Sequence, residues 1–271
     1  MPQSTSSAPA EVARPKPEPR AVRFAGLRFT PMTVAQAVQA LDHRAATAPF
    51  TAFVTPNAEH AYLRRVDAEF RACGDGCFVS TNDSRVLGRA AKLAGLDLEF
   101  APGAYVVPAL FEQVIRPDEP ITIIGCLPAL VADLKTKFGL TTVNHHNPPM
   151  GFIFDDAAVR VAVDFVAAHP ARFVFVAMGP PQSEKFCQRV SIDGRSTGIG
   201  LCIGSSLAVL TQQSNPAPDI MERTGLVWLY RLVKEPKRLW RRYLVRGLYG
   251  LMIGLGDILA LRLGLRSAAD V

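Results

Sequence analysis

Several motifs that mark common chemistries of α/β proteins are missing from this sequence. No Gly-x-Gly-x-x-Gly follows the first predicted strand, which excludes the usual dinucleotide fingerprint, and no Gly-x-x-x-x-Gly-Lys-Ser/Thr loop is present to hold a nucleoside triphosphate. A Gly-x-Ser-x-Gly nucleophile elbow is also absent. No Asp-x-Asp stands in a loop to bind a divalent metal on a nucleotide diphosphate, and Asp155 and Asp156 open a predicted helix, where capping is their favoured role.

Cysteine is scarce and has no metal-binding spacing. Cys73 and Cys77 have no matching second pair and no nearby histidine, so small buried side chains in a reducing cytoplasm are favoured over a zinc site. We interpret His145 and His146 as a pair on a surface loop. We therefore expect neither a divalent metal nor another cofactor. The five cysteines, an odd number, are Cys73, Cys77, Cys126, Cys187 and Cys202.

The start of the chain has little apolar content. Residues 1–20 hold five prolines with several serines and alanines, a composition typical of disorder, and we predict a disordered tail over residues 1–22. No apolar run follows the start, so we expect no signal peptide. No run of about 20 apolar residues free of charge occurs early or in the middle of the chain, so we expect no ordinary spanning helix there.

From Phe24 onward, short β-branched or aromatic runs alternate with segments of helical period. Near-continuous apolar strands, each followed by a helix, predict a parallel sheet covered on both faces. The sequence thus predicts an α/β fold over residues 23–224, a Rossmann-like parallel sheet flanked by helices. The predicted strands are Phe50–Thr55, Cys77–Ser80, Ile121–Ile124, Leu140–Val143, Arg172–Ala177 and Thr197–Ile203. The predicted helices are Ala58–Arg71, Ser84–Ala94, Ala129–Phe138, Asp155–Ala168, Gln182–Val190 and Ser206–Gln212.

Polar side chains and glycines gather where the predicted strands end. Ligands of a parallel α/β sheet bind beyond the carboxyl ends of its strands, near the N-termini of the following helices, so we expect a site there that suits phosphate. Helix capping is the alternative role for Asn57, Asp83 and Ser205. Asp83 and Glu184 are the two candidates for a general base.

The positive charge of the chain is concentrated between Gly225 and Arg246. This stretch holds seven basic residues and one acid, a balance of +6 that equals the formal net charge of the whole chain, and bulky apolar residues are interleaved with the charges. Pro236 interrupts it, so we predict one helix ending near Lys234 and a second with Pro236 in its first turn. Four basic residues recur at spacings that favour one helical face: Arg231, Lys234, Arg238 and Arg241.

The stretch Gly247–Leu265 is rich in leucine, isoleucine and glycine, with Asp257 and Arg262 as its charged residues. Two charges and several glycines make it a poor membrane span, so we predict an interfacial helix that continues from the basic one. A core helix or an oligomer-interface helix is the alternative, which leaves a homo-oligomer open. Residues 225–271 are therefore predicted to form a basic, amphipathic, membrane-associating helical appendage.

A set of motifs carries a resemblance to a known family: Thr55-Pro56-Asn57-Ala58-Glu59-His60, the Asp83 loop, Pro148-Pro149-Met150-Gly151-Phe152, Gly179-x-Pro181-x-x-Glu184, Gly225-Leu226-x-Trp228-Leu229-Tyr230-Arg231-Leu232, Glu235-Pro236-x-Arg238 and Arg241-Arg242-Tyr243. Over roughly residues 24–245 the sequence resembles the WecG/TagA/CpsF glycosyltransferases, glycosyltransferase family 26. The C-terminal motifs are long and specific, whereas the Thr-Pro-Asn piece alone would be weak.

The resemblance implies an inverting, metal-independent glycosyltransferase. It implies transfer of a hexose or N-acetylhexosamine from a UDP-sugar to a polyprenyl-diphosphate-linked sugar acceptor, in exopolysaccharide or cell-surface polysaccharide biosynthesis. It also implies a peripheral protein on the cytoplasmic face of the inner membrane, with the anionic membrane surface as a further partner.

The resemblance also implies roles for individual residues. Asp83 corresponds to the proposed catalytic base of the family. Arginines matching Arg231, Arg238 and Arg241 would meet the leaving group or the lipid phosphates in an appendage that closes the site at the membrane. The candidate donor-binding residues are Thr55, Asn57, Gly125, Gly179, Pro181, Glu184 and Gly204.

The sequence departs from the family pattern at several positions. Tyr105, Ala208 and Pro216 stand where the family has an acidic residue, a second acidic residue and an arginine, and these departures leave the donor sugar open. The alternative function is that of a non-catalytic basic α/β module that binds anionic lipid or nucleic acid. RNP-type aromatic signatures are not evident, so we expect no nucleic-acid partner.

Overall fold

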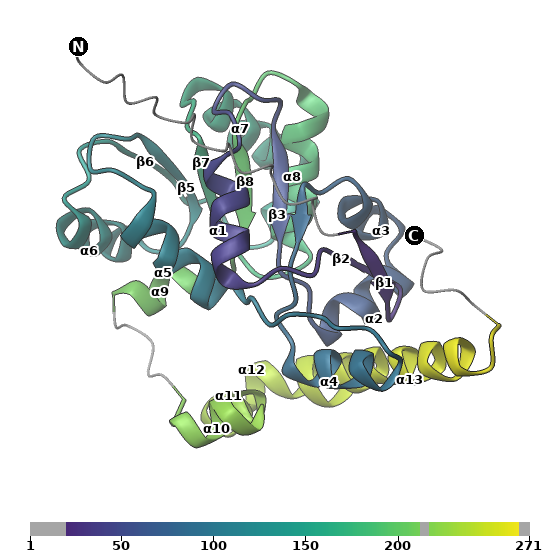
Figure 1. Ribbon diagram of the computed structural model, residues 1–271. Coiled ribbons are helices and arrows are strands. Elements are labelled where there is room, and N and C mark those ends of the chain that lie inside the picture. The colour runs from purple at the N-terminus through teal and green to yellow at the C-terminus, as the bar shows by residue number, and fades with distance from the viewer. Residues whose placement is uncertain (1–19, 212–216, 266–271) are drawn as a thin grey trace, which may run out of the picture.

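The computed structural model describes residues 20–211 and 217–265, and its central feature is a parallel β-sheet (Figure 1). The six strands follow the order β4-β3-β8-β7-β5-β6, and every neighbouring pair is parallel. Helices cover both faces, so the predicted α/β, Rossmann-like fold is confirmed. The strands are β3 (Thr51–Val54), β4 (Val79–Ser80), β5 (Ile121–Gly125), β6 (Val143–His146), β7 (Phe173–Ala177) and β8 (Ile199–Cys202).

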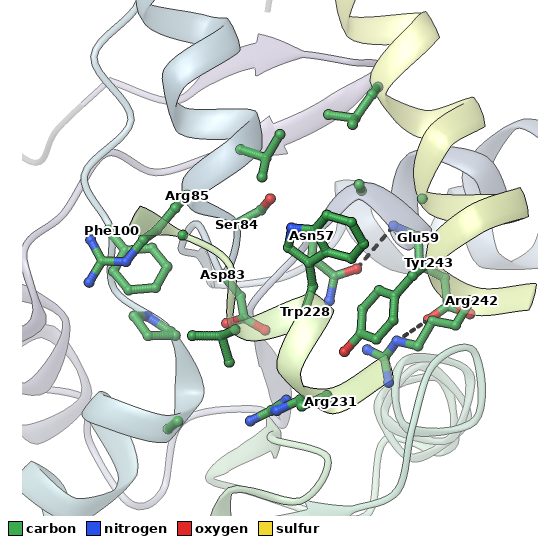
Figure 2. Close-up of a pocket in the computed structure, with 18 of the residues that line it drawn as sticks. Asn57, Glu59, Asp83, Ser84, Arg85, Phe100, Trp228, Arg231, Arg242 and Tyr243 are labelled. Atoms are coloured by element: carbon green, nitrogen blue, oxygen red, sulfur yellow. Dashed lines mark hydrogen bonds and ion pairs between the residues drawn. The ribbon is translucent and has the colours of Figure 1, made fainter. Parts of the chain in front are cut away.

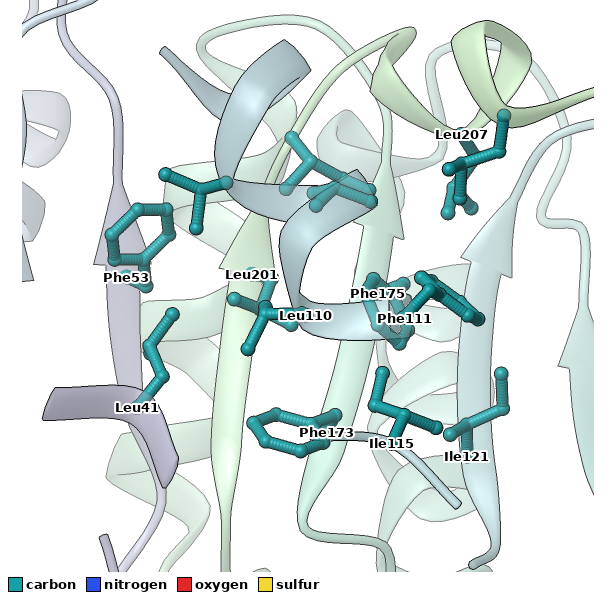
Figure 3. Packing of buried hydrophobic residues seen from close by; sticks show 14 of the residues in the cluster. Leu41, Phe53, Leu110, Phe111, Ile115, Ile121, Phe173, Phe175, Leu201 and Leu207 are labelled. Carbon is teal, nitrogen blue, oxygen red and sulfur yellow. The ribbon is translucent and has the colours of Figure 1, made fainter. Parts of the chain in front are cut away.

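The central strands β5, β7 and β8 are almost entirely buried, and their side chains alternate between two cores. On β7, Phe173 and Phe175 belong to one core, and Val174 and Val176 belong to the other. This alternation explains the near-continuous apolar sequence, because both faces of a helix-covered parallel sheet need apolar side chains. Figure 3 shows the first core, in which Phe111 of the overlying helix α5 stacks on Phe175 with ring centroids 5.2 Å apart.

Helices α1, α5, α6 and α9 contribute to the first core, and α7 and α8 contribute to the second. Helix α3 packs beside α8. Because all six strands run in the same direction, their carboxyl ends lie at one edge of the sheet. The N-termini of the helices that follow the strands lie near the same edge. The bounds of these helices are Val34–Asp42 (α1), Ala68–Asp75 (α3), Gly103–Gln113 (α5), Pro128–Phe138 (α6), Asp156–Ala168 (α7), Gln182–Asp193 (α8) and Ser206–Leu210 (α9).

A third core lies beyond the carboxyl end of the sheet. An antiparallel hairpin of β1 (Val22–Phe24) and β2 (Leu27–Phe29) packs there with three helices. Phe24, Leu87 and Ile258 are buried together in this core. The helices are α2 (Ala58–Val66), α4 (Arg85–Leu93) and α13 (Leu248–Arg262), and α4 and α13 run side by side in Figure 1. The C-terminal segment is thus part of the folded core.

The basic stretch forms two helices with the predicted break. Helix α11 (Val227–Lys234) ends before Glu235, and α12 begins with Pro236. Glu235 leaves the helical conformation, with φ −134° and ψ 61°, as expected where a following proline disfavours the α region. From Pro236 onward the chain is continuously helical to Arg262, through α12 (Pro236–Trp240), the π-helical turn η2 (Arg241–Gly247) and α13. The short α10 (Asp219–Thr224) precedes α11.

Three local predictions were wrong. The predicted helix Ala58–Arg71 is split into α2 and α3 at Asp67, whose extended backbone ends α2 and whose side chain accepts from the N–H of Phe70 to cap α3. The predicted strand at Leu140–Val143 lies later in the chain, as β6. His145 and His146 therefore sit in a strand rather than in a loop, and His145 Nε2 lies 3.0 Å from the carbonyl oxygen of Gly125.

Other elements fall outside the sequence predictions. Helices α1 and α5 and the β1–β2 hairpin were not predicted. The predicted tail is outside the described residues up to residue 19, and Val22 already belongs to β1. The last residue of the predicted helix Ser206–Gln212 is also outside them, and α9 ends at Leu210.

Helix α13 packs on the domain through glycines. Gly250 and Gly254 are buried against Ala58 and Phe24, because the absence of a side chain lets two backbones approach closely. The other side of the helix is apolar as well: Leu248, Met252, Leu255 and Leu259 are exposed. By length and composition alone, helix 236–262 could cross a membrane, and 22% of its most apolar window is buried. A single helix of this kind is weak support for a span, since helices of globular cores pass the same test.

We predict that Gly250→Ala destabilises the protein by about 1–3 kcal/mol, because a Cβ at this position would overlap the carbonyl oxygen of Ala58. Gly256→Ala, in the same helix with open space around its Cβ, is the matched control and should be neutral or stabilising by up to about 1 kcal/mol. Denaturant unfolding measures both. Equal effects of the two substitutions would contradict the glycine-mediated packing.

Candidate active site

A cavity of about 370 Å³ lies between the α/β domain and the C-terminal segment (Figure 2). Its walls come from the first turn of α2, the loop between β4 and α4, the start of α5 and the segment from α10 to α13. Most of the wall is apolar, and Trp228, Leu244 and Leu251 are examples from the C-terminal segment. A small number of polar and charged groups in a largely apolar enclosure is typical of a small-molecule site.

Asp83 enters this cavity from a loop that is fixed on both sides. The N–H of Asp83 donates to Pro56 O at 3.0 Å, and the buried Asn82 accepts from the N–H of Ser84 at 2.9 Å. Ser84 caps α4 by accepting from the N–H of Leu87, so capping is not the role of Asp83. The carboxyl of Asp83 is left to face the cavity, as Figure 2 shows.

Asn57 caps α2 and contacts Asp83 with the same side chain. Its Oδ1 accepts from the backbone N–H of Glu59 at 3.0 Å, the usual interaction of an N-cap. Because the oxygen is used for capping, the amide nitrogen is left to interact with the Asp83 carboxyl, and this interaction lowers the pKa of Asp83. The two roles that the sequence left as alternatives, cap and cavity residue, therefore both apply to Asn57.

Burial in the enclosure raises the pKa of Asp83 to about 6, although the side chain keeps some surface toward the cavity. The charges of Arg231, Arg242 and His60 and the hydrogen bond from Asn57 lower the pKa of Asp83 and so limit this rise. The carboxyl is mostly ionised at neutral pH and takes up a proton just below it. A pKa close to the working pH suits a general base.

Glu59 joins the C-terminal segment to α2. It is 6% exposed; its Oε2 forms an ion pair with Arg242 Nε and its Oε1 accepts from Arg246 Nη1, both at 2.9 Å. Within the described residues the terminal nitrogens of Arg242 have no hydrogen-bond partner, and Figure 2 shows its guanidinium at the cavity wall. Glu59 thus holds Arg242 through one nitrogen and leaves two for an anion, as a planar guanidinium allows.

The far end of the cavity has a second polar group. Tyr105 donates from its hydroxyl to Glu222 at 2.8 Å, and the Arg85 guanidinium lies over the ring of Phe100, 4.0 Å from its centroid. Burial and the neighbouring Glu222 raise the pKa of Tyr105. The cavity therefore has Arg231 and Arg242 near Asp83, and Tyr105, Glu222 and Arg85 as a second polar group.

The model of a known protein family, described as the "Glycosyl transferase WecG/TagA/CpsF family", matches residues 22–262. The chain belongs to this family. The match runs from β1 to the last residue of α13, so it includes every wall of the cavity. The resemblance seen in the sequence motifs is confirmed, and the chain is a glycosyltransferase of cell-surface polysaccharide biosynthesis.

The glycosyltransferase brings only part of the predicted arginine set to the cavity. Arg231 lines it, whereas Arg238 pairs with Glu235 on the surface and Arg241 lies exposed over the ring of Trp240. The reason is the break at Pro236, since a spacing of three and four continues one face only along an unbroken α-helix. From the C-terminal segment, the second guanidinium in the cavity belongs to Arg242 instead, and Arg85 of α4 also lines the wall.

The predicted donor-binding residues are divided in the same way. Asn57 lines the cavity, and Thr55 is buried behind it beside Gly103. Gly125, Gly179, Pro181 and Gly204 lie at the carboxyl edge of β5, β7 and β8, outside the wall of this cavity. Glu184, the second candidate base, is 5% exposed and contacts His60. The donor-binding roles of these residues stay predictions.

Sequence reasoning missed Glu59 and Arg242. Glu59 sits in the first turn of a helix, where a carboxylate is favoured by the helix dipole alone, so its position gives no sign of a partner in the C-terminal segment. Arg242 is one of seven basic residues in its stretch, and no local pattern distinguishes it from Arg241.

We predict that Arg242→Gln raises the pKa of Asp83 above its value of about 6, because the substitution removes a charge that favours the ionised carboxylate. Arg241→Gln, one residue away but outside the cavity, is the matched control and should leave the pKa of Asp83 unchanged. Carbon-detected NMR titration of the carboxyl measures both. An Asp83 pKa that is the same in both variants would contradict the placement of Arg242.

Proposed function

We propose that this glycosyltransferase is an inverting, metal-independent enzyme that acts on a UDP-sugar. It transfers a hexose or N-acetylhexosamine to a polyprenyl-diphosphate-linked sugar acceptor. The observation that carries the proposal is a carboxylate with a pKa of about 6, Asp83, in a largely apolar cavity where the guanidinium groups of Arg231 and Arg242 act on its charge. This combination offers one base and one site for a leaving diphosphate.

Asp83 acts as the general base. It removes the proton from the acceptor hydroxyl as that oxygen attacks the anomeric carbon, and the bond from that carbon to the UDP oxygen breaks on the opposite face of the sugar. A single carboxylate is sufficient for such a direct displacement. The interaction with the Asn57 amide favours the ionised form of the carboxyl.

Arg231 and Arg242 stabilise the leaving UDP. The charge that develops on its diphosphate is met by guanidinium groups that are already in place, a task that a divalent cation performs in other nucleotide-sugar enzymes. Among the described residues there is no cluster of three or more His, Cys, Asp or Glu side chains arranged to bind a metal. Arg238 and Arg241, exposed on the same segment, are available for the phosphates of the lipid acceptor.

The donor extends from the cavity along the carboxyl edge of the sheet. Thr55 and Asn57 follow β3 there, and the glycines that follow β5, β7 and β8 leave room for a ligand to approach the backbone. This extension would involve the remaining predicted donor-binding positions, Gly125, Gly179, Pro181 and Gly204.

The C-terminal segment seats the enzyme on the cytoplasmic face of the inner membrane. The exposed apolar side chains of α13 continue from a basic surface that includes Lys237, Arg238 and Arg241, a combination suited to anionic lipid. Leu248 of this helix also lines the cavity. A lipid-linked acceptor could therefore pass from the bilayer to Asp83 along apolar surface.

We predict that Asp83→Asn lowers the rate of UDP release by about 100-fold or more, the scale of a general-base contribution. The wild-type rate should fall as the pH drops through about 6, because a protonated Asp83 accepts no proton and its pKa has that value. A panel of UDP-sugars with a polyprenyl-diphosphate sugar acceptor, with and without chelator, is the assay.

Asp97→Asn, at an exposed carboxylate outside the cavity, is the control and should retain full activity. Loss of wild-type activity on chelation would refute metal independence. Lipid or nucleic-acid binding without any UDP release, unaffected by Asp83→Asn, would favour the non-catalytic alternative.

We predict that the double substitution of Leu255 and Leu259 by Glu lowers co-flotation with anionic vesicles several-fold, because both side chains are exposed on α13 and would lose their apolar contact with lipid. Val161→Glu, at an equally exposed apolar side chain of α7, is the control and should float as the wild type does. Unchanged flotation of the double variant would exclude this face as the lipid-binding surface.

A further inference from the structure

Four polar side chains are packed together behind the first turn of α2. Asn57, the first of them, reaches the cavity, and the other three are almost fully enclosed: His60 is 5% exposed, Glu184 5% and Ser183 1%. Burying polar and ionisable groups is costly unless each is paired. A group of this size next to a reactive carboxylate therefore needs an explanation beyond packing.

The contacts form a chain that ends at Asp83. Glu184 Oε1 lies 3.1 Å from His60 Nε2, and Ser183 Oγ lies 3.3 Å from Glu184 Oε2. On its other side the His60 ring meets Asn57 twice, with Nδ1 at 3.3 Å from the backbone nitrogen and 3.1 Å from Oδ1. With Glu184 accepting from Nε2–H, a neutral ring accepts from the Asn57 N–H, and a protonated ring donates to the Asn57 Oδ1. Either form restrains Asn57.

The identity of residue 57 is explained by Asp83 rather than by capping. Aspartate and serine cap helices as well as asparagine does. An ionised aspartate can only accept, and a serine hydroxyl is one bond shorter, whereas the asparagine amide carries a nitrogen donor on the side opposite its capping oxygen. The capping bond from Glu59 N–H and, when the ring is protonated, the bond from His60 Nδ1 to Oδ1 together define the direction of that amide.

Glu184 does not reach the cavity that holds Asp83. It borders a separate small cavity of about 20 Å³, together with Pro56 and His60. It comes from the first turn of α8, and 124 positions separate it from His60 on α2. Its effect on Asp83 must therefore pass through the His60 ring.

We propose that His60 and Glu184 form a buried positioning pair, which holds Asn57 with its amide nitrogen directed at the Asp83 carboxylate. This inference rests on the proposed role of Asp83 as the general base. The pair is anchored in α8, the helix that follows the Gly179 loop, so it also links the proposed donor edge of the sheet to the base.

Glu184→Gln is the test, because it keeps the size of the side chain and removes its charge. We expect kcat to fall roughly tenfold, the lower end of what outer hydrogen-bonding partners contribute at metal sites, with little change in the KM for the donor. The acid limb of the pH profile should move to higher pH, since His60 lowers the pKa of Asp83 and loses its counter-charge in the variant. In the double variant with His60→Gln the losses should not add, because the pair acts as a unit.

Glu119→Gln is the matched control. Glu119 pairs with Arg172 at 2.6 Å near the amino ends of β5 and β7, on the opposite edge of the sheet, so its loss should lower stability and leave kcat and the pH profile unchanged. Asn57→Ser keeps a helix cap and removes the amide nitrogen, so it should reproduce the kinetic loss and the pH shift even where the Glu184 variant folds poorly.

Wild-type kcat and an unmoved acid limb in Glu184→Gln, or in Asn57→Ser, would overturn the positioning role. NMR titration of Asp83 in the same variants tests that role without any substrate, because the pKa of the carboxyl should rise in both. Full activity of Asp83→Asn would instead refute the proposed function, so the two failures are distinguishable.

Discussion

The contact between Glu59 and two arginines of η2 is the interaction on which the site depends. A buried carboxylate is stable only when it is paired, and Glu59 finds its partners in a segment 183 and 187 positions along the chain. Arg242 and Arg246 keep part of their surface in water, so their ion pairs with Glu59 add little net stability. Their main effect is to orient the two arginine side chains. With Glu59 in place, Arg242 faces the cavity, and the α12–α13 helix becomes one wall of it.

The first turn of α2 combines several tasks within four residues. Asn57 caps the helix and contacts Asp83, Glu59 holds the C-terminal segment, and His60 faces the interior toward Glu184. Successive residues of a helical turn point in different directions, so this one turn contacts Asp83, the C-terminal segment and Glu184. The close approach of Gly250 to Ala58 seats α13 against the same turn.

The cavity balances two opposing effects on Asp83. Its apolar wall raises the pKa of the carboxyl, and the nearby guanidinium groups lower it, so that the carboxyl titrates near neutrality. The same features suit an amphiphilic substrate, because a lipid chain favours the apolar wall and a diphosphate favours the arginines.

The sequence by itself determined the features that depend on near neighbours. The unbroken apolar run Phe173–Val176 predicted a sheet covered on both faces, Pro236 predicted the helix break, and the strand-end loops indicated Asn57 and Asp83. The tertiary structure decided which side chains meet. The phase of the helix after Pro236 placed Arg242, rather than Arg238 or Arg241, in the cavity. The ion pair with Glu59 of α2 holds Arg242 there. Local patterns carry no record of a partner more than 180 positions away, because such a contact arises only when the chain has folded.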